Sequence, residues 1–421
     1  MKFARTVVPL VVAGVLAAGL SACGSASASD YAEQNLEGRG PITFVQGKDN
    51  NGVIQPIIDR WNAKYPDQKV TLKEQTDQAD QQRDDLVRNF QARNSGYDVV
   101  RVDVVWTAEF AAKRWLQPLT GSMAVDTSGM LPATVAAATY QNTLFASPVT
   151  SDGGMLYYRS DLVPNPPKTW AEMMSMCSIA KANNMSCFAG QYAQYEGLTV
   201  NAAEAINSAG GQILDEQSKL SINTPEAKAG LSNLVEAYRN GNIPVQAVTY
   251  QEEQSRQAFQ DGNLLFLRNW PYVYSLASTD ATSKVAGKFA VTALPGQSGA
   301  GASSLGGASA GISVFSKNKA TARDFVQFLT SEEIQRFYVT QASNAPVLAK
   351  LYDDPELVAK LPYLPVLKTS IENAVPRPVT PFYPAVTKAI QSNAYAAIRG
   401  QKSVDQAIID MQKSMEAAGV K

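Results

Sequence analysis

Between Ile42 and Val105 the sequence alternates between β-rich runs and segments with helical spacing of apolar residues. Ile42–Val45, Val70–Leu72 and the valine-rich run Val99–Val105 predict strands, and the residues between them predict two helices. Strands that are joined through helices pair in parallel, so this β-α-β-α-β order predicts a parallel sheet covered by helices. We therefore expect an α/β fold.

The rest of the chain continues this alternation without an internal repeat. A capping box at Thr169–Glu172 and the pair Thr224–Pro225 each predict the start of a helix. Leu264–Leu267 and Ile312–Phe315 predict strands. The stretch Gly296–Gly311 is rich in Gly, Ser and Ala, which favours a surface loop, with a direct role in binding as the alternative.

The first residues carry the features of an export signal. Two basic residues precede Val7–Leu20, an apolar run that is too short to span a membrane comfortably. Small residues then lead to Cys23, which predicts cleavage before Cys23 and attachment of a diacylglyceryl group to its thiol, so that the residue carries two or three acyl chains such as palmitate. We expect a signal peptide over residues 1–22 and a lipidated tether over residues 23–40, at the extracytoplasmic face of the cell membrane. The alternative is a plain signal peptide that ends beside a free cysteine.

The charge balance argues against nucleic acid as a partner. The chain has 37 basic and 38 acidic residues, and removal of residues 1–22 takes away two basic residues and no acidic one. The mature chain is therefore slightly acidic, whereas nucleic-acid binding depends on cations that neutralise phosphates.

The chain contains no histidine. This absence removes a common zinc ligand and the usual general base, and with them the Ser-His-Asp triad and the Cys-His pair. We expect no metal and no cofactor, and an enzyme of this composition would depend on carboxylates, Lys or Tyr. Cys177 and Cys187 predict a disulfide in an exported protein, with two reduced buried thiols as the alternative.

Three charged residues stand where a solvated charge is out of place. Asp103 interrupts a valine-rich strand, so it needs a structural partner or lies at the strand's end beside a cleft. Asp152 precedes two glycines between apolar segments, which indicates either a plain turn or a close approach to another surface. Arg377 lies between two prolines. It could clamp the hydroxyl groups of a ligand, or it could form an ion pair with one of these acids across two lobes of the fold.

Aromatic and acidic residues also cluster in the middle of the chain. Tyr195 and Glu196 follow a polar stretch, Glu253 begins a short helix, and Trp270 and Tyr272 follow the predicted strand Leu264–Leu267. Aromatic faces suit the C–H face of a sugar ring, and its hydroxyls need carboxylate, amide and guanidinium partners. Each of these aromatics could instead belong to the core.

Several motifs occur in the order found in one known family. They are Asp103-Val104-Val105-Trp106, Leu156-Tyr157-Tyr158-Arg159, Tyr195-Glu196-Gly197-Leu198, Arg268-Asn269-Trp270-Pro271-Tyr272, Leu305-Gly306-Gly307 and Glu372-Asn373-Ala374-Val375-Pro376-Arg377-Pro378. With them the chain resembles the extracellular solute-binding proteins of ABC importers, and within these the trehalose- and maltose-binding proteins. The resemblance covers nearly the whole mature chain.

The resemblance implies a two-lobe periplasmic-binding-protein fold of the maltose-binding kind, with three crossings and a ligand cleft between the lobes. It implies an N-terminal lobe of residues 41–151 and 309–344, and a C-terminal lobe of residues 152–308 and 345–421. The sugar-binding positions that we expect are Asn51, Arg83, Asp103, Asp152, Tyr195, Glu196, Glu253, Trp270, Tyr272, Gly307 and Arg377.

Two positions depart from the family pattern. Where relatives that bind both trehalose and maltose have an acid near the first strand, this chain has Asn51. Where those relatives have tryptophan after the paired glycines, it has Ala308. The preference between trehalose and maltose therefore stays open.

We expect a monomeric, lipid-anchored binding protein that is not an enzyme. It would capture a disaccharide, trehalose or maltose, and deliver it to the permease subunits of an importer driven by an ATPase. One rival is the same scaffold with another solute, such as an oligosaccharide, a polyol or a glycerophosphodiester. A second is a glycosidase that uses two of the carboxylates of Asp103, Asp152, Glu196 and Glu253.

Overall fold

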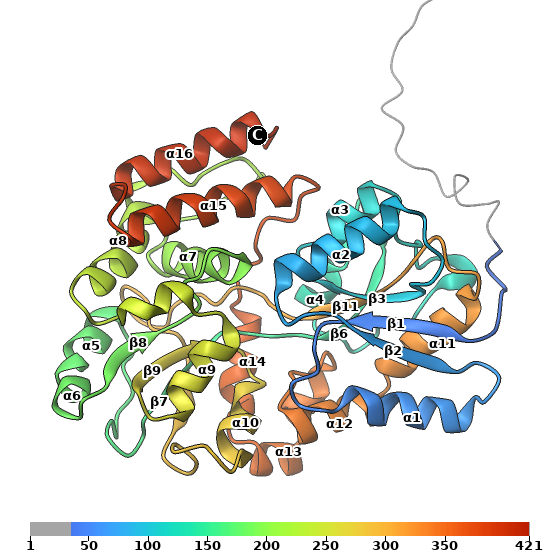
Figure 1. Cartoon of the computed structure of the whole chain (residues 1–421), viewed down its shortest axis with the longest axis horizontal. Helices are drawn as coiled ribbons and strands as arrows, with labels where there is room; N and C mark the ends of the chain where they lie inside the picture. Colours follow the sequence, from blue (N-terminus) through green and yellow to red (C-terminus); the bar gives the residue numbers. More distant parts are fainter. Residues whose placement is uncertain (1–34, 421) are drawn as a thin grey trace, which may run out of the picture. The chain divides into compact units, whose positions relative to one another are not determined.

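Two large β-sheets, a two-stranded sheet and the surrounding helices make up the computed structural model, which describes residues 35–420 (Figure 1). The signal peptide, the lipidation site Cys23 and the first part of the tether lie outside the described residues, so they stay predictions. Within the described residues, no helix has both the length and the apolar character needed to cross a membrane.

The first sheet has the strand order β2-β1-β3-β11-β6. Its strands are β1 (Ile42–Gln46), β2 (Val70–Glu74), β3 (Val99–Asp103), β6 (Ala146–Thr150) and β11 (Ala308–Ile312). Both β2 and β3 pair in parallel with β1, which confirms the predicted β-α-β-α-β arrangement. The connecting helices are α1 (Ile54–Lys64) and α2 (Ala79–Gln91). In contrast, β11 runs antiparallel to β3 and β6, so the sheet is mixed.

Strand β11 corrects two sequence predictions. It covers Ala308–Ile312, whereas the sequence predicted a strand over Ile312–Phe315 and a loop over Gly296–Gly311. The strand is central in the sheet and fully buried, and a Cβ atom at Gly311 would lie 2.8 Å from the Leu116 side chain. Small residues therefore fit this position because neighbouring side chains already fill the space around the strand.

The second sheet has the strand order β10-β7-β9-β8. Its strands are β7 (Met155–Tyr158), β8 (Ser186–Ala189), β9 (Leu264–Asn269) and β10 (Ala290–Thr292). Helix α7 (Glu196–Ser208) packs against both α8 (Pro225–Arg239) and α15 (Tyr383–Ile398), and α16 (Val404–Ala417) packs on α15 (Figure 1). The predicted capping box at Thr169–Glu172 and the predicted cap at Thr224 are both present.

The remaining elements are shorter or lie on the outside of the sheets. They are α3 (Thr107–Ala112), α4 (Pro132–Ala137), β4 (Thr139–Tyr140), β5 (Thr143–Leu144), α5 (Trp170–Ser175), α6 (Cys177–Ala182), α9 (Glu252–Gln260), α10 (Val273–Thr279), α11 (Lys319–Leu329), α12 (Glu332–Ala342), α13 (Pro355–Lys360) and α14 (Leu364–Glu372), with 3-10 turns η2 (Gly121–Met123), η3 (Val245–Thr249) and η4 (Ala349–Tyr352). In the structure a disulfide joins Cys177 of α6 to Cys187 of β8.

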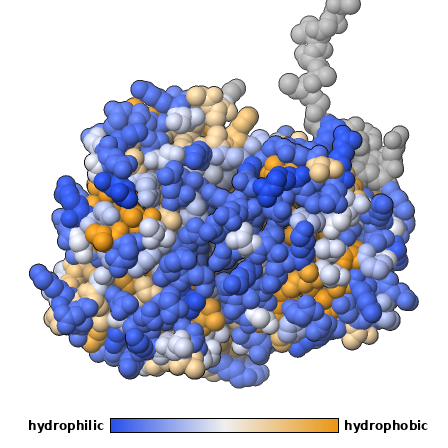
Figure 2. Space-filling model, viewed as in Figure 1, coloured by the Kyte–Doolittle hydropathy of each residue, from blue (hydrophilic) through white to orange (hydrophobic). Residues whose placement is uncertain are grey.

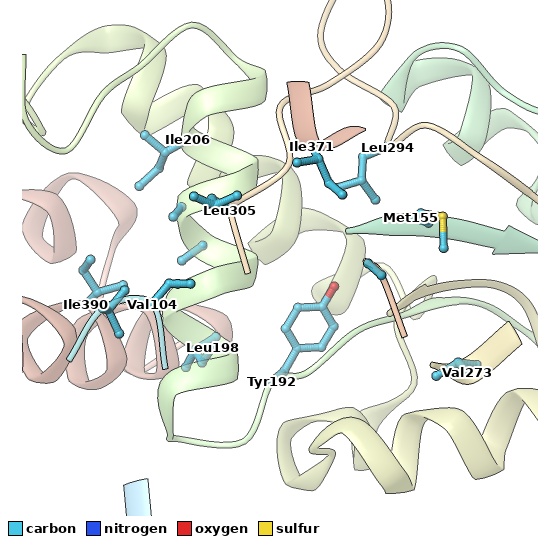
Figure 3. Packing of buried hydrophobic residues seen from close by; sticks show 14 of the residues in the cluster. Val104, Met155, Tyr192, Leu198, Ile206, Val273, Leu294, Leu305, Ile371 and Ile390 are labelled. Carbon is cyan, nitrogen blue, oxygen red and sulfur yellow. The ribbon is translucent and has the colours of Figure 1, made fainter. Parts of the chain in front are cut away.

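Two apolar cores support the sheets. One contains Trp61 of α1 and Phe325 of α11, which cover the first sheet. The larger core includes Leu198 of α7 and Ile390 of α15 together with Val104, which directly follows β3 (Figure 3). This core therefore contains residues from both sides of the molecule. The segment directly after β3 packs through Val104 in the same core as helices α7 and α15.

The strands of each sheet fall within the segments predicted for one lobe, except that β11 begins one residue earlier, at Ala308. The chain leaves the first sheet after β6, returns to it at β11, and leaves it again after α12. These passages agree with three crossings, and the exact lobe boundaries stay a prediction.

Candidate functional site

A polar cleft of about 270 Å³ is lined by residues of both sheets. Gln46 ends β1 and Asp103 ends β3 on one side, whereas Trp270 follows β9 on the other. In α/β folds, ligands bind outside the carboxyl ends of the strands, because the chain turns there and leaves a crevice. Hydrophilic residues also dominate the face of the molecule in Figure 2.

Most of the predicted sugar-binding residues line this cleft. They are Asn51, Asp103, Asp152, Glu196, Glu253, Trp270, Tyr272, Gly307 and Arg377. These residues come from segments that are far apart in the sequence, so the fold brings them together. Ala308, the position where the chain departs from the family pattern, also lines the cleft.

Two predicted residues, Arg83 and Tyr195, are not among the residues that line the cleft. Arg83 donates to the buried Glu109, from Nε to Oε2 at 3.0 Å and from Nη2 to Oε1 at 2.6 Å. Tyr195 is buried and donates from its hydroxyl to Oε2 of Glu252 at 2.7 Å. Arg83 thus neutralises a buried carboxylate, and Tyr195 supports a cleft residue from behind.

Arg377 lies at the centre of a buried ionic network. Its side chain donates to Oε1 of Glu196 through a short contact, and its Nη2 lies 3.3 Å from Oδ1 of Asp103. Glu196 begins α7 beside the second sheet and Asp103 ends β3 of the first. The predicted ion pair between lobes is therefore present, and Arg377 lines the cleft as well.

Two hydroxyl groups and its burial also act on the Glu196 carboxylate. It accepts hydrogen bonds from the hydroxyls of Tyr383 and Thr387, the latter at 2.6 Å. Burial raises the pKa of Glu196, and the positive charge of Arg377 opposes that effect. For Arg377, burial alone disfavours the charge, but Tyr383 and the carboxylates of Asp103 and Glu196 outweigh it and raise its pKa. The network joins the end of β3 to the start of α7, while Nε of the buried Arg377 has no hydrogen-bond partner in the described part of the chain.

The aromatic side of the cleft is built from Trp270 and Tyr272. The Tyr272 hydroxyl donates to Oε1 of Glu253 at 2.5 Å, and Oε2 of Glu253 accepts from Nε and Nη2 of Arg256 at 2.9 and 2.7 Å. Glu253 is thus oriented by two partners, and its remaining acceptor capacity can receive a ligand hydroxyl.

Asp152 lies on the crossing between β6 and β7. Burial raises the pKa of its carboxyl to about 6, while Arg101 lowers it, Asp103 raises it and Arg268 lowers it. Its backbone N–H donates to the carbonyl of Gly306 at 3.2 Å, which ties two crossing segments together. Asp152 is therefore a cleft residue and not only part of a turn.

The sequence did not predict several polar residues of the cleft. They are Gln46, Lys48, Asp49, Asn50, Asp77, Gln82, Arg101, Gln251, Glu252, Gln254 and Asn344. Gln46 ends β1, and residues 48–50 follow shortly after that strand. Trp106, which also lines the cleft, follows β3 at a similar distance along the chain. The strand-end rule that pointed to Asp103 would also have found this segment.

Comparison with known proteins agrees with this architecture. Residues 46–336 match the family described as "Bacterial extracellular solute-binding protein", and the chain belongs to that family. A protein of Deinococcus radiodurans described as "Probable ABC transporter-binding protein" is 34% identical over 357 residues, which cover 81% of this chain and 84% of that protein.

Solved structures give the same assignment. The structure described as maltose-bound T. maritima MalE3 is 34% identical to this chain with a TM-score of 0.86, and the match covers 90% of this chain and 99% of that one. A solute-binding protein from Thermotoga lettingae with bound α-D-tagatose shares the fold at 23% identity and a TM-score of 0.81, over 90% of this chain and all of that one. The chain is thus an extracellular solute-binding protein with the fold of the maltose-bound relative.

Proposed function

We propose that this protein captures a neutral disaccharide, maltose or trehalose, and delivers it to the membrane permease of an ABC importer. The observation that carries the proposal is a cleft lined by both aromatic rings and carboxylates. The rings belong to Trp270 and Tyr272, and the carboxylates belong to Asp103, at the end of β3, and to Asp152, between β6 and β7. An aromatic face packs on the C–H face of a sugar ring, and the carboxylates accept its hydroxyls.

The charges of the cleft favour a neutral solute over an anionic one. Its acidic lining residues are Asp49, Asp77, Asp103, Asp152, Glu196, Glu252 and Glu253, and its basic ones are Lys48, Arg101 and Arg377. Arg377 is already paired with carboxylates, and the seven acidic residues of the lining outnumber Lys48 and Arg101, so the cleft as a whole repels a phosphate. The site therefore disfavours glycerophosphodiesters and sugar phosphates.

The volume of the cleft supports a small ligand. Ligand sites usually measure about 300–1,000 Å³, and this cleft of about 270 Å³ lies just below that range. A preformed polar site of this kind is consistent with an affinity near 1 μM, or about −8 kcal/mol. The maltose bound to the T. maritima relative supports maltose as a candidate. Asn51 and Ala308 leave trehalose equally open.

The proposal includes a lipid anchor at Cys23 and a monomeric protein with an N-terminal lobe of residues 41–151 and 309–344. An acylated Cys23 would hold the protein beside its importer. Metabolic labelling with a radioactive fatty acid tests this part: the native chain should incorporate label, and Cys23→Ser should not. Equal labelling of both would contradict the anchor.

A thermal-shift screen tests the ligand, because a solute that binds only the folded state raises the melting temperature. At least one of maltose and trehalose should raise it, and a glycerophosphodiester should not. Trp270→Ala should weaken binding by about 10- to 100-fold, through loss of aromatic contact area, and leave the unliganded protein folded. A shift with a polyol but with no disaccharide would contradict the proposal. Conversion of the disaccharide to monosaccharides would instead favour the glycosidase.

A further inference from the structure

A buried ion pair lies directly behind the aromatic side of the cleft. Arg268 is 2% exposed and donates to Glu204 through two parallel hydrogen bonds, from Nε to Oε2 at 2.7 Å and from Nη2 to Oε1 at 2.6 Å. Its Nη1 also donates to Oε1 of Gln191 at 3.2 Å. Neither Arg268 nor Glu204 lines the cleft; both line a separate cavity of about 50 Å³.

The ion pair also contacts Trp270, the cleft residue proposed to pack on a sugar ring and called the platform below. The Arg268 guanidinium carbon lies 3.9 Å from the centroid of the Trp270 ring. A Cβ atom at Gly306 would lie 2.7 Å from the Cζ3 atom of the same ring, so the backbone there approaches the indole closely. Trp270 is thus confined by a cation on one face and by the Gly306 backbone at its six-membered ring, which restricts how it meets a ligand.

The same pair contacts two segments that connect the sheets. Oε1 of Glu204 accepts from the backbone N–H of Ser304 at 3.0 Å, on the segment that leads to β11. A Cβ atom at Gly154 would lie 2.7 Å from Oε1 of Glu204 and 2.8 Å from Nη2 of Arg268. The pair therefore fills the space beside Gly154, which follows the cleft residue Asp152. It links Trp270 to two of the three crossings, those at Gly154 and Ser304.

Stability alone does not explain a pair in this place. Removing two charges from water is costly, and well-packed apolar residues often stabilise a core as well as a buried ion pair does. A planar guanidinium with two fixed hydrogen bonds, however, holds a defined orientation under an aromatic ring. The geometry accounts for a positioning role better than for a contribution to stability.

We propose that Arg268, held by Glu204, is a positioning residue that fixes the plane of Trp270 for sugar binding. This inference rests on the proposed function, because the platform is taken to receive a sugar ring. The pair acts on the ligand only through Trp270, so its loss should reduce affinity only when Trp270 is present.

A double-mutant cycle with two readouts tests this role. The variant Arg268→Met with Glu204→Gln removes both charges together and so leaves no unpaired buried charge. We expect affinity for the disaccharide found in the screen to fall about tenfold in the native background, and by less than twofold when Trp270→Ala is also present. Near-ultraviolet circular dichroism provides the second readout. The contribution of Trp270, taken as the difference from Trp270→Phe, should fall by at least half.

The control removes another ion pair with two parallel hydrogen bonds on the second sheet's side of the chain, one that is more exposed than Arg268–Glu204. Arg159 donates to Asp161 through two hydrogen bonds of 2.8 and 2.6 Å. Arg159→Met with Asp161→Asn should leave both the affinity and the Trp270 spectrum unchanged. If the first variant does not fold, Arg268→Lys replaces it, since an ammonium keeps the charge but not the two parallel hydrogen bonds; a partial loss of the Trp270 spectrum is then expected.

Equal losses of affinity with and without Trp270 would overturn the positioning role, as would an unchanged Trp270 spectrum. Failure of the native protein to bind any disaccharide would overturn the proposed function instead. The circular dichroism measurement needs no ligand, so it still decides whether Arg268 fixes the ring.

Discussion

Asp152 provides a quantitative test of the cleft through the pH dependence of sugar binding. Burial raises the pKa of its carboxyl from 3.8 to about 6. In the unliganded protein the carboxyl is therefore mostly protonated below pH 6, where a free aspartate would still be ionised. A sugar hydroxyl that donates to this carboxylate favours the ionised form. Ligand binding should therefore lower the pKa of Asp152 and release a proton near pH 6.

The size of the effect follows from the two pKa values. If the bound state returns the pKa to near 3.8, linkage gives an affinity about tenfold higher at pH 7 than at pH 5. In the unliganded protein, the folded state binds the Asp152 proton more tightly than the unfolded chain does. Asp152 therefore adds stability at pH values below about 6, and this contribution, on the order of 3 kcal/mol at most, is lost as the pH rises through 6.

Isothermal titration calorimetry at pH 5, 6 and 7 measures both the affinity and, from buffers with different ionisation enthalpies, the proton release. Asp152→Asn is the control, because it keeps the size of the side chain and cannot titrate. In that variant the affinity should change by less than about threefold over the same range. An unchanged affinity of the native protein between pH 5 and 7, or equal proton release from both proteins, would refute the reasoning.

Two further substitutions test how the cleft is built. Gly306→Ala should weaken disaccharide binding by about tenfold, because its Cβ would lie 2.7 Å from the Trp270 ring and displace it, as titration calorimetry can measure. Gly299→Ala, with nothing within 4 Å of its Cβ, is the matched control. Arg83→Ala should lower the free energy of unfolding by about 1–3 kcal/mol in urea denaturation, since Glu109 loses its hydrogen bonds from Arg83 and keeps only Lys113 as a charged partner, and should leave the affinity within twofold.

The outcomes that contradict these two predictions are distinct. Native affinity in Gly306→Ala would show that the indole tolerates displacement or does not contact the sugar. A large loss of affinity in Arg83→Ala, with the protein still folded, would return Arg83 to the sugar site that the sequence predicted for it.

The regular elements were largely predictable from local sequence patterns. The strands at Ile42 and Val70 and the helix that begins at Thr224 follow clear periodicity and capping signals, and the structure confirms them. Strand β11 was missed because Ala308–Ile312 consists mostly of small residues, which indicate a loop unless the neighbouring side chains are known. Only the tertiary packing shows that the space beside Gly311 is already filled.

The site was predictable where residue type and strand position agreed. Asp103 and Trp270 each lie at or after the end of a strand, and both line the cleft. Arg83 does not line the cleft but pairs with Glu109, which lies 26 residues away, and no local pattern reveals that pairing. The pairing of Arg268 with Glu204 was not predicted for the same reason, since the two residues are 64 positions apart in the sequence.

Calorimetric titration of the purified protein with maltose and trehalose at pH 7 tests the central claim most directly. The cleft geometry predicts saturable binding of one disaccharide per chain with an affinity near 1 μM for at least one of the two sugars, and binding at least about tenfold weaker after Trp270→Ala. No heat of binding with either sugar, or equal binding by the native protein and Trp270→Ala, would contradict the claim that this cleft holds a disaccharide.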